Sequence, residues 1–473
     1  MLFNSFEFLV LTLVTFAIYY LPPFRRVQVA ILIVASLVFY GYANPTLLAL
    51  FLFSVLINVV SSYSVVYGKL STQKLVLTIG VVFNLGILAF FKYSPLVGNT
   101  FFNAEQGIGA WLVQIPLPVG ISFFTFEGIS LLVDAYRGRE TTRTEGVVPP
   151  SLGAHAMNTT FFVAFFPHLI AGPILKAHHF IPQIRQKFYR DIPWEFCFRN
   201  LVTGYFLKMV VADQLSQQTY WIQYPYFEVQ SSLMLIVLLF GYSIQIFADF
   251  AGYSLIALGV AGLFGYRLEK NFDFPYISTS FSEFWRRWHI SLSTFLKEYL
   301  YIPLGGNRKG NVRTYINLFV TMLLGGLWHG AAWSYAIWGM FHGGALAIER
   351  LIKDLYGRKQ SEPPRVLRIL SGVFVFSLVT FAWLFFKLTD ISDVVKYIAA
   401  IKHNTNIASN KTRILYIIVY SLPVVVYHLL YLSKNLQSGA LRWQRLEPLV
   451  YGLMLFMIAT NCGIGGEFIY FQF

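Results

Sequence analysis

Charged residues are scarce in this sequence, and their scarcity decides the class of protein. Lys, Arg, Asp and Glu make up 12% of the 473 residues, whereas a soluble domain carries about 25%. Cysteine is rarer still, because Cys197 and Cys462 are the only two. They are too few and too far apart for a disulfide framework or a thiolate metal site. Residues 1–7 lack the basic start of a signal peptide, and no cleavage site follows, so we expect a first membrane span there.

Hydrophobic residues, by contrast, reach 56% of the chain, with 46 Phe and 29 Tyr. A helical span needs roughly 20 mainly apolar residues. Such stretches lie at about 7–22, 27–43, 45–66, 75–98, 117–135, 230–248, 250–265, 315–332, 333–349, 368–388, 412–432 and 447–461. Segments 157–175 and 197–215 are interrupted by polar residues or Pro, as re-entrant helices often are. We therefore predict an all-α polytopic protein with one membrane-embedded domain over residues 1–473.

The distribution of Lys and Arg predicts how the chain crosses the membrane. About thirty of the 36 basic residues fall into clusters that alternate with the candidate spans. The clusters lie at 25–26, 69–74, 137–143, 176–208, 267–313, 350–368 and 434–445. Because basic residues accumulate in cytoplasmic loops, we place the clusters in the cytoplasm and both termini outside. The net charge of +14 then reflects these loops and not a nucleic-acid partner.

Residues 266–314 form the most unusual segment between two spans. They mix Trp, Tyr and Arg with short apolar runs, which makes the segment too polar to span and too apolar for a free loop. We expect interfacial helices, or helices that dip into the protein, on the cytoplasmic side.

An ionisable side chain lies deep in an apolar stretch at His329. Such a group at bilayer depth costs several kcal/mol unless it has a partner or water. A packed imidazole bonded to a backbone carbonyl is one interpretation, and a catalytic imidazole is the other.

Several motifs resemble one known family. They are FWRRWHISL at 284–292, YIPLGGN at 301–307 and WHGAAW at 328–333, with LPVGISFFTF at 117–126, DAYRG at 134–138, FPHLIAGPI at 166–174 and DFAGYS at 249–254. In this order they resemble the membrane-bound O-acyltransferase family, in particular the bacterial branch typified by the alginate O-acetyltransferase membrane subunit. The resemblance runs nearly end to end and weakens at about 389–446. It implies a bundle of about 11–14 helices, some re-entrant or interfacial, around a central tunnel in a bacterial inner membrane.

The resemblance also implies a mechanism, in which an acyl group passes from a cytoplasmic thioester to a hydroxyl. The family's histidine maps onto His329 and its second polar motif residue onto His289. A hydroxyl needs a base to remove its proton as it attacks, and a buried, neutral imidazole suits that role. His329 is therefore the expected general base. For the oxyanion, His289, Asn307 and backbone amides all remain candidates.

The donor is expected to be acetyl-coenzyme A or another acyl thioester, bound as a substrate and not as a cofactor. Candidate donor- or substrate-binding residues are Trp285, Arg286, Arg287, Asn307 and Trp328. Arg grips phosphate with its planar fork, although the cytoplasmic excess of basic residues explains the same cluster.

Other histidines are expected to be structural. His342 follows one helix face after His329, and we interpret it as a packing residue. His168, His178 and His179 lie close together in sequence. We expect no metal site there because no carboxylate or cysteine completes a ligand set.

The aromatic end of the chain, 462–473, is expected outside the membrane. Its FIYFQF run is costly in water, so it should anchor at the interface, fold back into the protein or dock on a partner. It resembles the tail of the small peptide partner of teichoic-acid D-alanylation systems. By that likeness, Tyr470 carries the acyl group transiently or orients the acceptor.

These observations predict a membrane O-acetyltransferase for an extracytoplasmic polysaccharide, as in alginate or other exopolysaccharide biosynthesis. A separate exported SGNH-type acetyltransferase and the polysaccharide machinery are the expected partners. One alternative is transfer of D-alanyl or a longer acyl group. The other is a polysaccharide transporter or flippase without chemistry, which should carry acidic residues within its spans and inverted repeats; Asp134 and Asp249 lie near predicted span ends.

Overall fold

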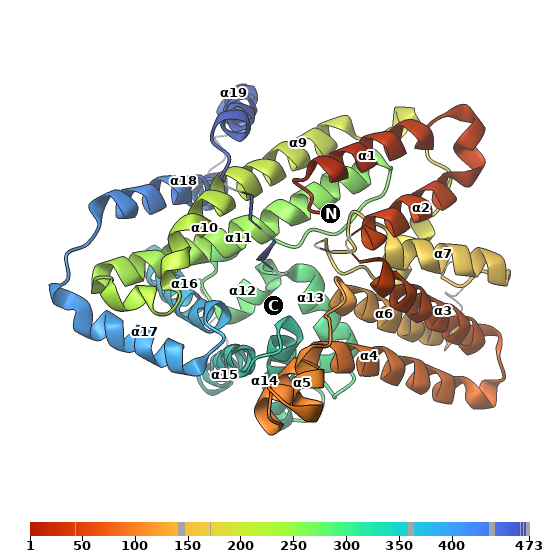
Figure 1. Cartoon of the computed structure of the whole chain (residues 1–473), viewed down its shortest axis with the longest axis horizontal. Helices are drawn as coiled ribbons and strands as arrows, with labels where there is room; N and C mark the ends of the chain where they lie inside the picture. The colour runs from red at the N-terminus through yellow and green to blue at the C-terminus, as the bar shows by residue number, and fades with distance from the viewer. Residues whose placement is uncertain are drawn as a thin grey trace. The chain divides into compact units, whose positions relative to one another are not determined.

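The computed structural model describes the chain apart from residues 43, 141–146, 171, 358–363, 435–439, 464, 467 and 470–473. Every regular element in the described part is helical (Figure 1). Six described helical segments are long and apolar enough to cross a membrane. They are Pro22–Gly41, Pro45–Tyr67, Leu70–Phe101, Ser232–Leu263, Arg365–Lys387 and Lys411–Leu432. The predicted class, an all-α multi-pass membrane protein, is therefore confirmed.

The described chain divides into two compact units. Unit 1 comprises residues 1–201 and 254–269, and unit 2 comprises residues 202–253 and 270–473. Each unit is described by itself below. The prediction of a single domain over the whole chain stays a prediction.

Unit 1 contains helices α1 to α8 and the beginning of α9. Their bounds are α1 Phe6–Tyr19, α2 Gln28–Gly41, α3 Pro45–Tyr67, α4 Gln73–Phe101, α5 Gly107–Val113, α6 Ile121–Glu140, α7 Leu152–Ala164, α8 Ala177–Phe180 and α9 Trp194–Tyr205. The predicted segment 157–175 is helical only as far as Ala164. After that residue the chain continues without a long helix, as expected for a segment interrupted by Pro167 and Pro173.

A pair of buried amides joins α3 to α4 in unit 1. Asn58 Nδ2 donates to Asn84 Oδ1 at 3.2 Å, and Asn84 Nδ2 donates back to Asn58 Oδ1 at 2.9 Å. A Cβ at Gly128 of α6 would lie 2.6 Å from the Asn58 amide and 2.7 Å from Asn84. The small residue therefore lets α6 pack directly on the amide pair, which is how polar and small residues hold membrane helices together.

Unit 2 contains the remaining helices. They are α10 Asp213–Thr219, α11 Ser232–Leu263, α12 Phe281–Arg287, α13 Ile290–Leu296, α14 Asn311–His329, α15 Trp333–Tyr356, α16 Arg365–Lys387, α17 Ile391–His403, α18 Lys411–Lys434 and α19 Ala440–Thr460. Of α11, residues 254–263 belong to unit 1. A π-helical segment, Phe206–Ala212, joins α9 to α10, so the predicted segment 197–215 is helical throughout.

The prediction of separate spans at 230–248 and 250–265 was wrong. Helix α11 runs unbroken for 32 residues, and Asp249 lies near its middle and not at a span end. Gly252 does not end the helix; a Cβ there would lie 2.9 Å from the carbonyl oxygen of Gly204. The glycine thus allows close packing. Helix α11 is mostly buried: 72% of its most apolar 18 residues lie inside the protein, against 17% for the helical segment Leu70–Phe101, which contains α4.

Helices α14 and α15 overlap the predicted spans 315–332 and 333–349 and lie against each other. Neither is among the six described segments that are long and apolar enough to cross a membrane, so their role as spans stays a prediction. A Cβ at Gly326 would lie 2.3 Å from the carbonyl oxygen of Tyr335 and 2.8 Å from the Cα of Gly339. The two glycines therefore permit a backbone approach that no larger residue allows. This crossing fixes the C-terminal end of α14, where His329 lies.

Candidate active site

His329 is the last residue of α14 and is 3% exposed. Its ring centroid lies 5.1 Å from that of Trp328, 5.1 Å from Trp338 and 5.2 Å from Phe386. A Cβ at Gly330 would lie 2.1 Å from the Tyr335 ring, so the helix can end here only on a glycine. The imidazole is thus held in an aromatic enclosure of unit 2.

His289 lies beside His329. It precedes α13, is fully buried, and its ring centroid is 6.3 Å from that of His329 and 4.7 Å from that of Phe250. Burial lowers the pKa of His289 to about 3, so this imidazole is neutral at any physiological pH. Two histidines 40 positions apart in sequence therefore face the same apolar surroundings.

The backbone of His289 is strained. Its φ of 43° lies in the left-handed region, which costs a non-glycine residue about 1–3 kcal/mol and persists only where neighbours enforce it. Here the neighbour that enforces the strained backbone is Asn271, through two hydrogen bonds. Ile290 N donates to the Asn271 carbonyl at 2.9 Å, and Ser291 Oγ donates to Asn271 Oδ1 at 2.6 Å. Asn271 therefore positions the turn that carries His289.

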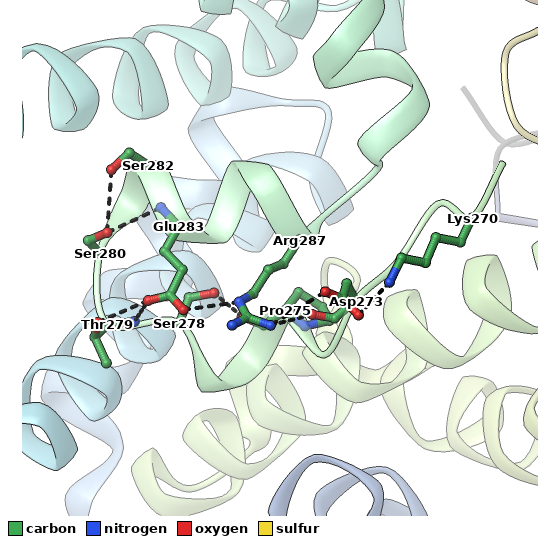
Figure 2. A network of polar contacts seen from close by, with 9 residues as sticks. All are labelled: Lys270, Asp273, Pro275, Ser278, Thr279, Ser280, Ser282, Glu283 and Arg287. Carbon is green, nitrogen blue, oxygen red and sulfur yellow. Dashed lines mark hydrogen bonds and ion pairs between the residues drawn. The ribbon is translucent and has the colours of Figure 1, made fainter. Parts of the chain in front are cut away.

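A polar network, which we call the 270–287 network, joins Arg287, just before this turn, to the segment around Asp273 (Figure 2). Arg287 Nε donates to Glu283 Oε1 at 3.0 Å, and Arg287 Nη1 donates to the Asp273 carbonyl at 3.0 Å. Asp273 N donates back to the Arg287 carbonyl at 2.9 Å. Lys270 and Thr279 complete it, through Asp273 Oδ1 at 2.7 Å and Glu283 Oε2 at 2.9 Å.

The electrostatics of this network favour its charged form. Burial raises the pKa of Glu283, but hydrogen bonds from Thr279 and the charge of Arg287 outweigh it and leave the pKa below its usual value. The Arg287 guanidinium also lies 5.5 Å from the centre of the Tyr431 ring. Arg287 is thus engaged inside the protein, and its position two residues before His289 makes it a support of that residue.

The two candidate tryptophans, Trp328 and Trp285, have different surroundings. Trp328 lies beside both histidines, with its ring centroid 6.1 Å from that of His289 and 5.1 Å from that of His329. Trp285 is buried, and its indole N–H donates to His342 Nδ1 at 3.3 Å, which supports the structural interpretation of His342.

Arg286 and Asn307 are exposed, and Asn307 accepts a hydrogen bond from the Tyr301 hydroxyl. Neither is brought to the histidines by a described contact. Tyr470 lies outside the described residues.

The end of the described chain is folded into unit 2. Phe468 is fully buried and Ile469 is 3% exposed. The Phe468 ring lies 4.3 Å from that of Tyr253 and 5.9 Å from that of Phe250, the residue that also contacts His289. The expectation that the aromatic tail avoids water is met for these two residues by insertion into the protein.

Three buried charged residues hold this tail; we call them the buried cluster. Lys208 Nζ lies 2.7 Å from Asp213 Oδ1 and 2.8 Å from Asp249 Oδ1, and all three side chains are at most 4% exposed. Lys208 Nζ also donates to the Gly466 carbonyl at 3.1 Å, and Ile469 N donates to Asp249 Oδ2 at 2.7 Å. The acid expected near a span end is therefore ion-paired inside the protein.

The reason given for excluding a metal site in unit 1 was wrong. Carboxylates do approach His168, His178 and His179, because Glu127, Asp134 and Glu269 respectively pair with them. Each histidine takes a different carboxylate. No described group of three or more His, Cys, Asp or Glu side chains could share one metal ion.

Comparison with known proteins decides the family. Residues 151–389 match the sequence profile of the membrane-bound O-acyltransferase family. A probable alginate O-acetylase of Azotobacter vinelandii is 39% identical over 411 residues, which cover 85% of this chain and 78% of the relative. The chain belongs to the membrane-bound O-acyltransferase family. It is therefore an O-acyltransferase, and the motifs that enclose His289 and His329 lie within the matched residues.

Further relatives of this O-acyltransferase modify other polymers, as their names state. A peptidoglycan O-acetyltransferase of Helicobacter pylori is 31% identical over 493 residues, with 93% of this chain and 91% of the relative covered. A teichoic acid D-alanyltransferase of Bacillus subtilis is 27% identical over 282 residues, with 57% and 68% covered. Polymer acylation is the common theme of these names.

Sequence reasoning missed the residues that enclose and support the two histidines. They are Phe250, Asn271, Trp338 and Phe386, together with the partners of Arg287. Phe250 stands in the DFAGYS motif, which was a signal for the region but not for a contact with His289. Asn271 stands among charged as well as aromatic residues, so the sequence carried no signal that it positions His289.

Proposed function

We propose that this protein moves an acetyl group from acetyl-coenzyme A across the membrane for O-acetylation of an extracytoplasmic polysaccharide, with His329 as the general base. The observation that carries the proposal is the pair of buried imidazoles, His289 and His329, with ring centroids 6.3 Å apart. Each stands in a motif shared with a family of O-acyltransferases. One neutral imidazole can accept a proton while its neighbour donates a hydrogen bond, which is the pair of functions that acyl transfer needs.

In the proposed reaction, the acceptor hydroxyl oxygen attacks the thioester carbonyl carbon. His329 accepts the hydroxyl proton as the new C–O bond forms. His289 donates a hydrogen bond to the oxyanion that forms on the thioester carbonyl oxygen within the apolar enclosure. The C–S bond then breaks, and the proton held by His329 passes to the departing thiolate. An ester and free coenzyme A result, and both imidazoles return to the neutral form.

The proposed orientation has both termini outside a bacterial inner membrane. Helix α11 removes one of the crossings expected from the sequence. We propose that the helical segment 194–219 supplies another crossing and that α7 and the chain after it do not cross. The number of crossings then stays even. The basic clusters fall on the cytoplasmic side, as the accumulation of Lys and Arg in cytoplasmic loops requires, apart from Arg199 and Lys208, which lie within the segment 194–219.

The polymer acceptor and the partners follow from the relatives' names and from the tail. Relatives named alginate O-acetylase and peptidoglycan O-acetyltransferase support a cell-envelope or exported polysaccharide. We propose that an exported SGNH-type acetyltransferase places the group on the sugar. Tyr470 is the proposed transient carrier or acceptor guide. In support, Phe468, two residues earlier in the sequence, lies beside Phe250, which also contacts His289.

The decisive experiment uses the purified full chain in lipid nanodiscs with radiolabelled acetyl-coenzyme A. The wild type should release coenzyme A and transfer the label. His329→Ala should lower the rate about 10²–10⁴-fold, the usual contribution of a general base. His155→Ala is the matched control, because His155 is also a buried imidazole, 2.8 Å from Ser62 Oγ in unit 1. A His329→Ala variant that folds and keeps full activity would contradict the proposed base.

Two cell assays separate the alternatives. If the enzyme transfers D-alanyl or a longer group, acetyl-coenzyme A is not consumed and the corresponding acyl thioester is. If the protein only exports polymer, His329→Ala leaves both the polymer and its acetyl esters unchanged. Our proposal expects normal export of polymer without esters.

Tyr470→Phe tests the role of the tail. If Tyr470 carries the group, this variant should stop polymer acetylation while thioester cleavage continues. Unchanged acetylation of the polymer would remove Tyr470 from the mechanism.

A further inference from the structure

Unit 1 contains a pocket that the transfer mechanism does not use. Its volume is about 1170 Å³, somewhat above the range of about 300–1,000 Å³ for pockets that bind small molecules. Its walls come from 182–196, between α8 and α9, and from 262–268, at the end of α11. Under the orientation proposed above, both segments lie on the cytoplasmic side.

The pocket is built on two reciprocal amide clamps. Gln28 donates to the Lys187 carbonyl at 3.0 Å and accepts from Lys187 N at 2.9 Å. Gln183 donates to the Arg267 carbonyl at 3.1 Å and accepts from Arg267 N at 2.9 Å. Each clamp holds the backbone of a cationic residue, and the side chain of that residue takes no part in the clamp. The two walls are therefore set before any ligand arrives.

Three cations line this pocket: Arg185, Lys187 and Arg267. Among the described residues, none of the three forms an ion pair, and the carboxylate in the wall, Asp191, lies 3.7 Å from Arg190. The Lys187 ammonium lies 4.6 Å from the centre of the Tyr266 ring. Unpaired cations at close quarters repel one another, so this arrangement favours an anion between them.

The electrostatic effect of the cluster is visible in Lys187. Burial, and then the charges of Arg185 and Arg267, lower its pKa to about 8. A bound anion would reverse that effect and favour the charged amine.

We propose that this pocket binds a phosphate-bearing ligand through Arg185, Lys187 and Arg267. Arg and Lys are the side chains that bind phosphate, the first through a planar fork and the second as a point charge. The exposed rings of Phe188 and Phe196 in the same wall offer an apolar surface for the rest of the ligand. Two sources have this chemistry: the nucleotide of a coenzyme A thioester and the headgroup of an anionic phospholipid.

The inference rests on the proposed function for its orientation and for one of its two ligands, but the test measures ligand binding and not transfer, so its failure can be distinguished from failure of the transfer reaction. Full-length protein is placed in nanodiscs of zwitterionic phosphatidylcholine, and coenzyme A binding is measured by isothermal titration calorimetry. In a second arm the nanodiscs contain phosphatidylglycerol, and the lipid retained by the protein is measured by native mass spectrometry. Binding in the first arm that the pocket substitutions weaken assigns the pocket to the nucleotide, and selective retention in the second that they weaken assigns it to the lipid.

Substitutions decide whether the pocket is the site. Lys187→Met and Arg267→Gln should each weaken binding about tenfold, the worth of one charge-assisted hydrogen bond. Both leave the clamps intact, because the clamps use backbone atoms. Arg267→Lys should keep most of the affinity. Lys69→Met and Lys74→Met, exposed lysines of unit 1 outside the pocket, are the charge-matched controls.

A pH series adds a readout that a purely structural role would not move. Wild-type affinity should fall as the pH rises from 7 to 9, because Lys187 loses its proton near pH 8. The Lys187→Met variant should lack that fall. The proposal is overturned if neither ligand binds, or if the pocket variants and the controls bind equally in both arms.

Discussion

Two groups of charged residues in unit 2 flank the histidine pair, and they differ in their exposure to solvent. The buried cluster around Lys208 is at most 4% exposed, whereas side chains of the 270–287 network are between 19% and 61% exposed. The first ties the end of the chain to α11, and the second supports the turn of His289. Ion pairs and hydrogen bonds thus hold the end of the chain rigidly in the buried cluster, whereas in the half-exposed 270–287 network they support the turn of His289 with less constraint.

The physical difference lies in what happens when one partner is removed. In the buried cluster, loss of a partner leaves a charge in a low-dielectric interior, which costs about 3–5 kcal/mol. In a half-exposed pair, water replaces the partner, and the cost is about 0–1 kcal/mol. The buried cluster should therefore control whether unit 2 folds, and the network should control how well His289 is placed.

The largest effect is expected for Lys208→Met. It leaves Asp213 and Asp249 facing each other without their shared cation, so unfolding should become easier by about 3–5 kcal/mol, with little folded protein recovered. Thermal unfolding in detergent measures the change. Adding Asp213→Asn and Asp249→Asn to Lys208→Met removes the uncompensated charge and should restore much of the stability. If the single variant is as stable as the wild type, the cluster does not hold unit 2 together.

The next effect is expected for Phe468→Ala, which empties the place of a buried ring beside Tyr253 and Phe250. Large-to-small changes of this kind cost about 3–5 kcal/mol. Because Phe250 also contacts His289, the rate of acyl transfer should fall as well. Phe468→Leu should recover most of both, since it fills much of the volume. Thermal unfolding and transfer rate are measured on the same samples, and an unchanged rate in Phe468→Ala would separate the tail from the histidine pair.

These two clusters also show what could be predicted from the sequence. His329 stood out because an imidazole among apolar residues is costly, and helices α14 and α15 formed at the predicted segments 315–332 and 333–349. Asp249 was placed at a break between two spans, because a sequence does not reveal that a carboxylate has an ion partner. That partner, Lys208, and the contact with Gly466 join positions 41 and 258 residues apart, a separation that no local pattern encodes.

The sequence did not reveal the partners of Arg287 in the 270–287 network, and the reason was a different one. A basic residue on the cytoplasmic side has a general explanation, so its sequence context did not distinguish a free guanidinium from an engaged one. The partners that decide the matter, Glu283 and the Asp273 carbonyl, lie four and 14 positions before Arg287 in the sequence. The contact with Glu283 could have been predicted from the spacing of four residues on one helix. The contact with Asp273 could not, because it depends on how the chain turns between the two residues.

A smaller effect on stability, with a clear effect on rate, is expected for Arg287→Gln. Loss of the half-exposed ion pair should cost at most about 1 kcal/mol. The turn of His289 loses one support, so the kcat of acyl transfer should fall several-fold while the KM for the thioester stays the same. Arg286→Gln, an exposed neighbour, is the control and should change neither. A rise in KM without a change in kcat would instead make Arg287 a donor-binding residue, as the sequence alone suggested.

The smallest effect is expected for Glu283→Gln and concerns pH. The pKa of Glu283 in the folded protein is below its usual value of 4.5, so its charge contributes stability above that pH, and the contribution is lost as the pH falls through the folded pKa. Near pH 7 the variant should be less stable by at most about 1 kcal/mol, and the difference from the wild type should shrink below pH 4.5. Unfolding midpoints in urea across this range measure it. A difference that persists at low pH would mean that Glu283 acts through packing, and the 270–287 network would then resemble the buried cluster in being insensitive to the solvent.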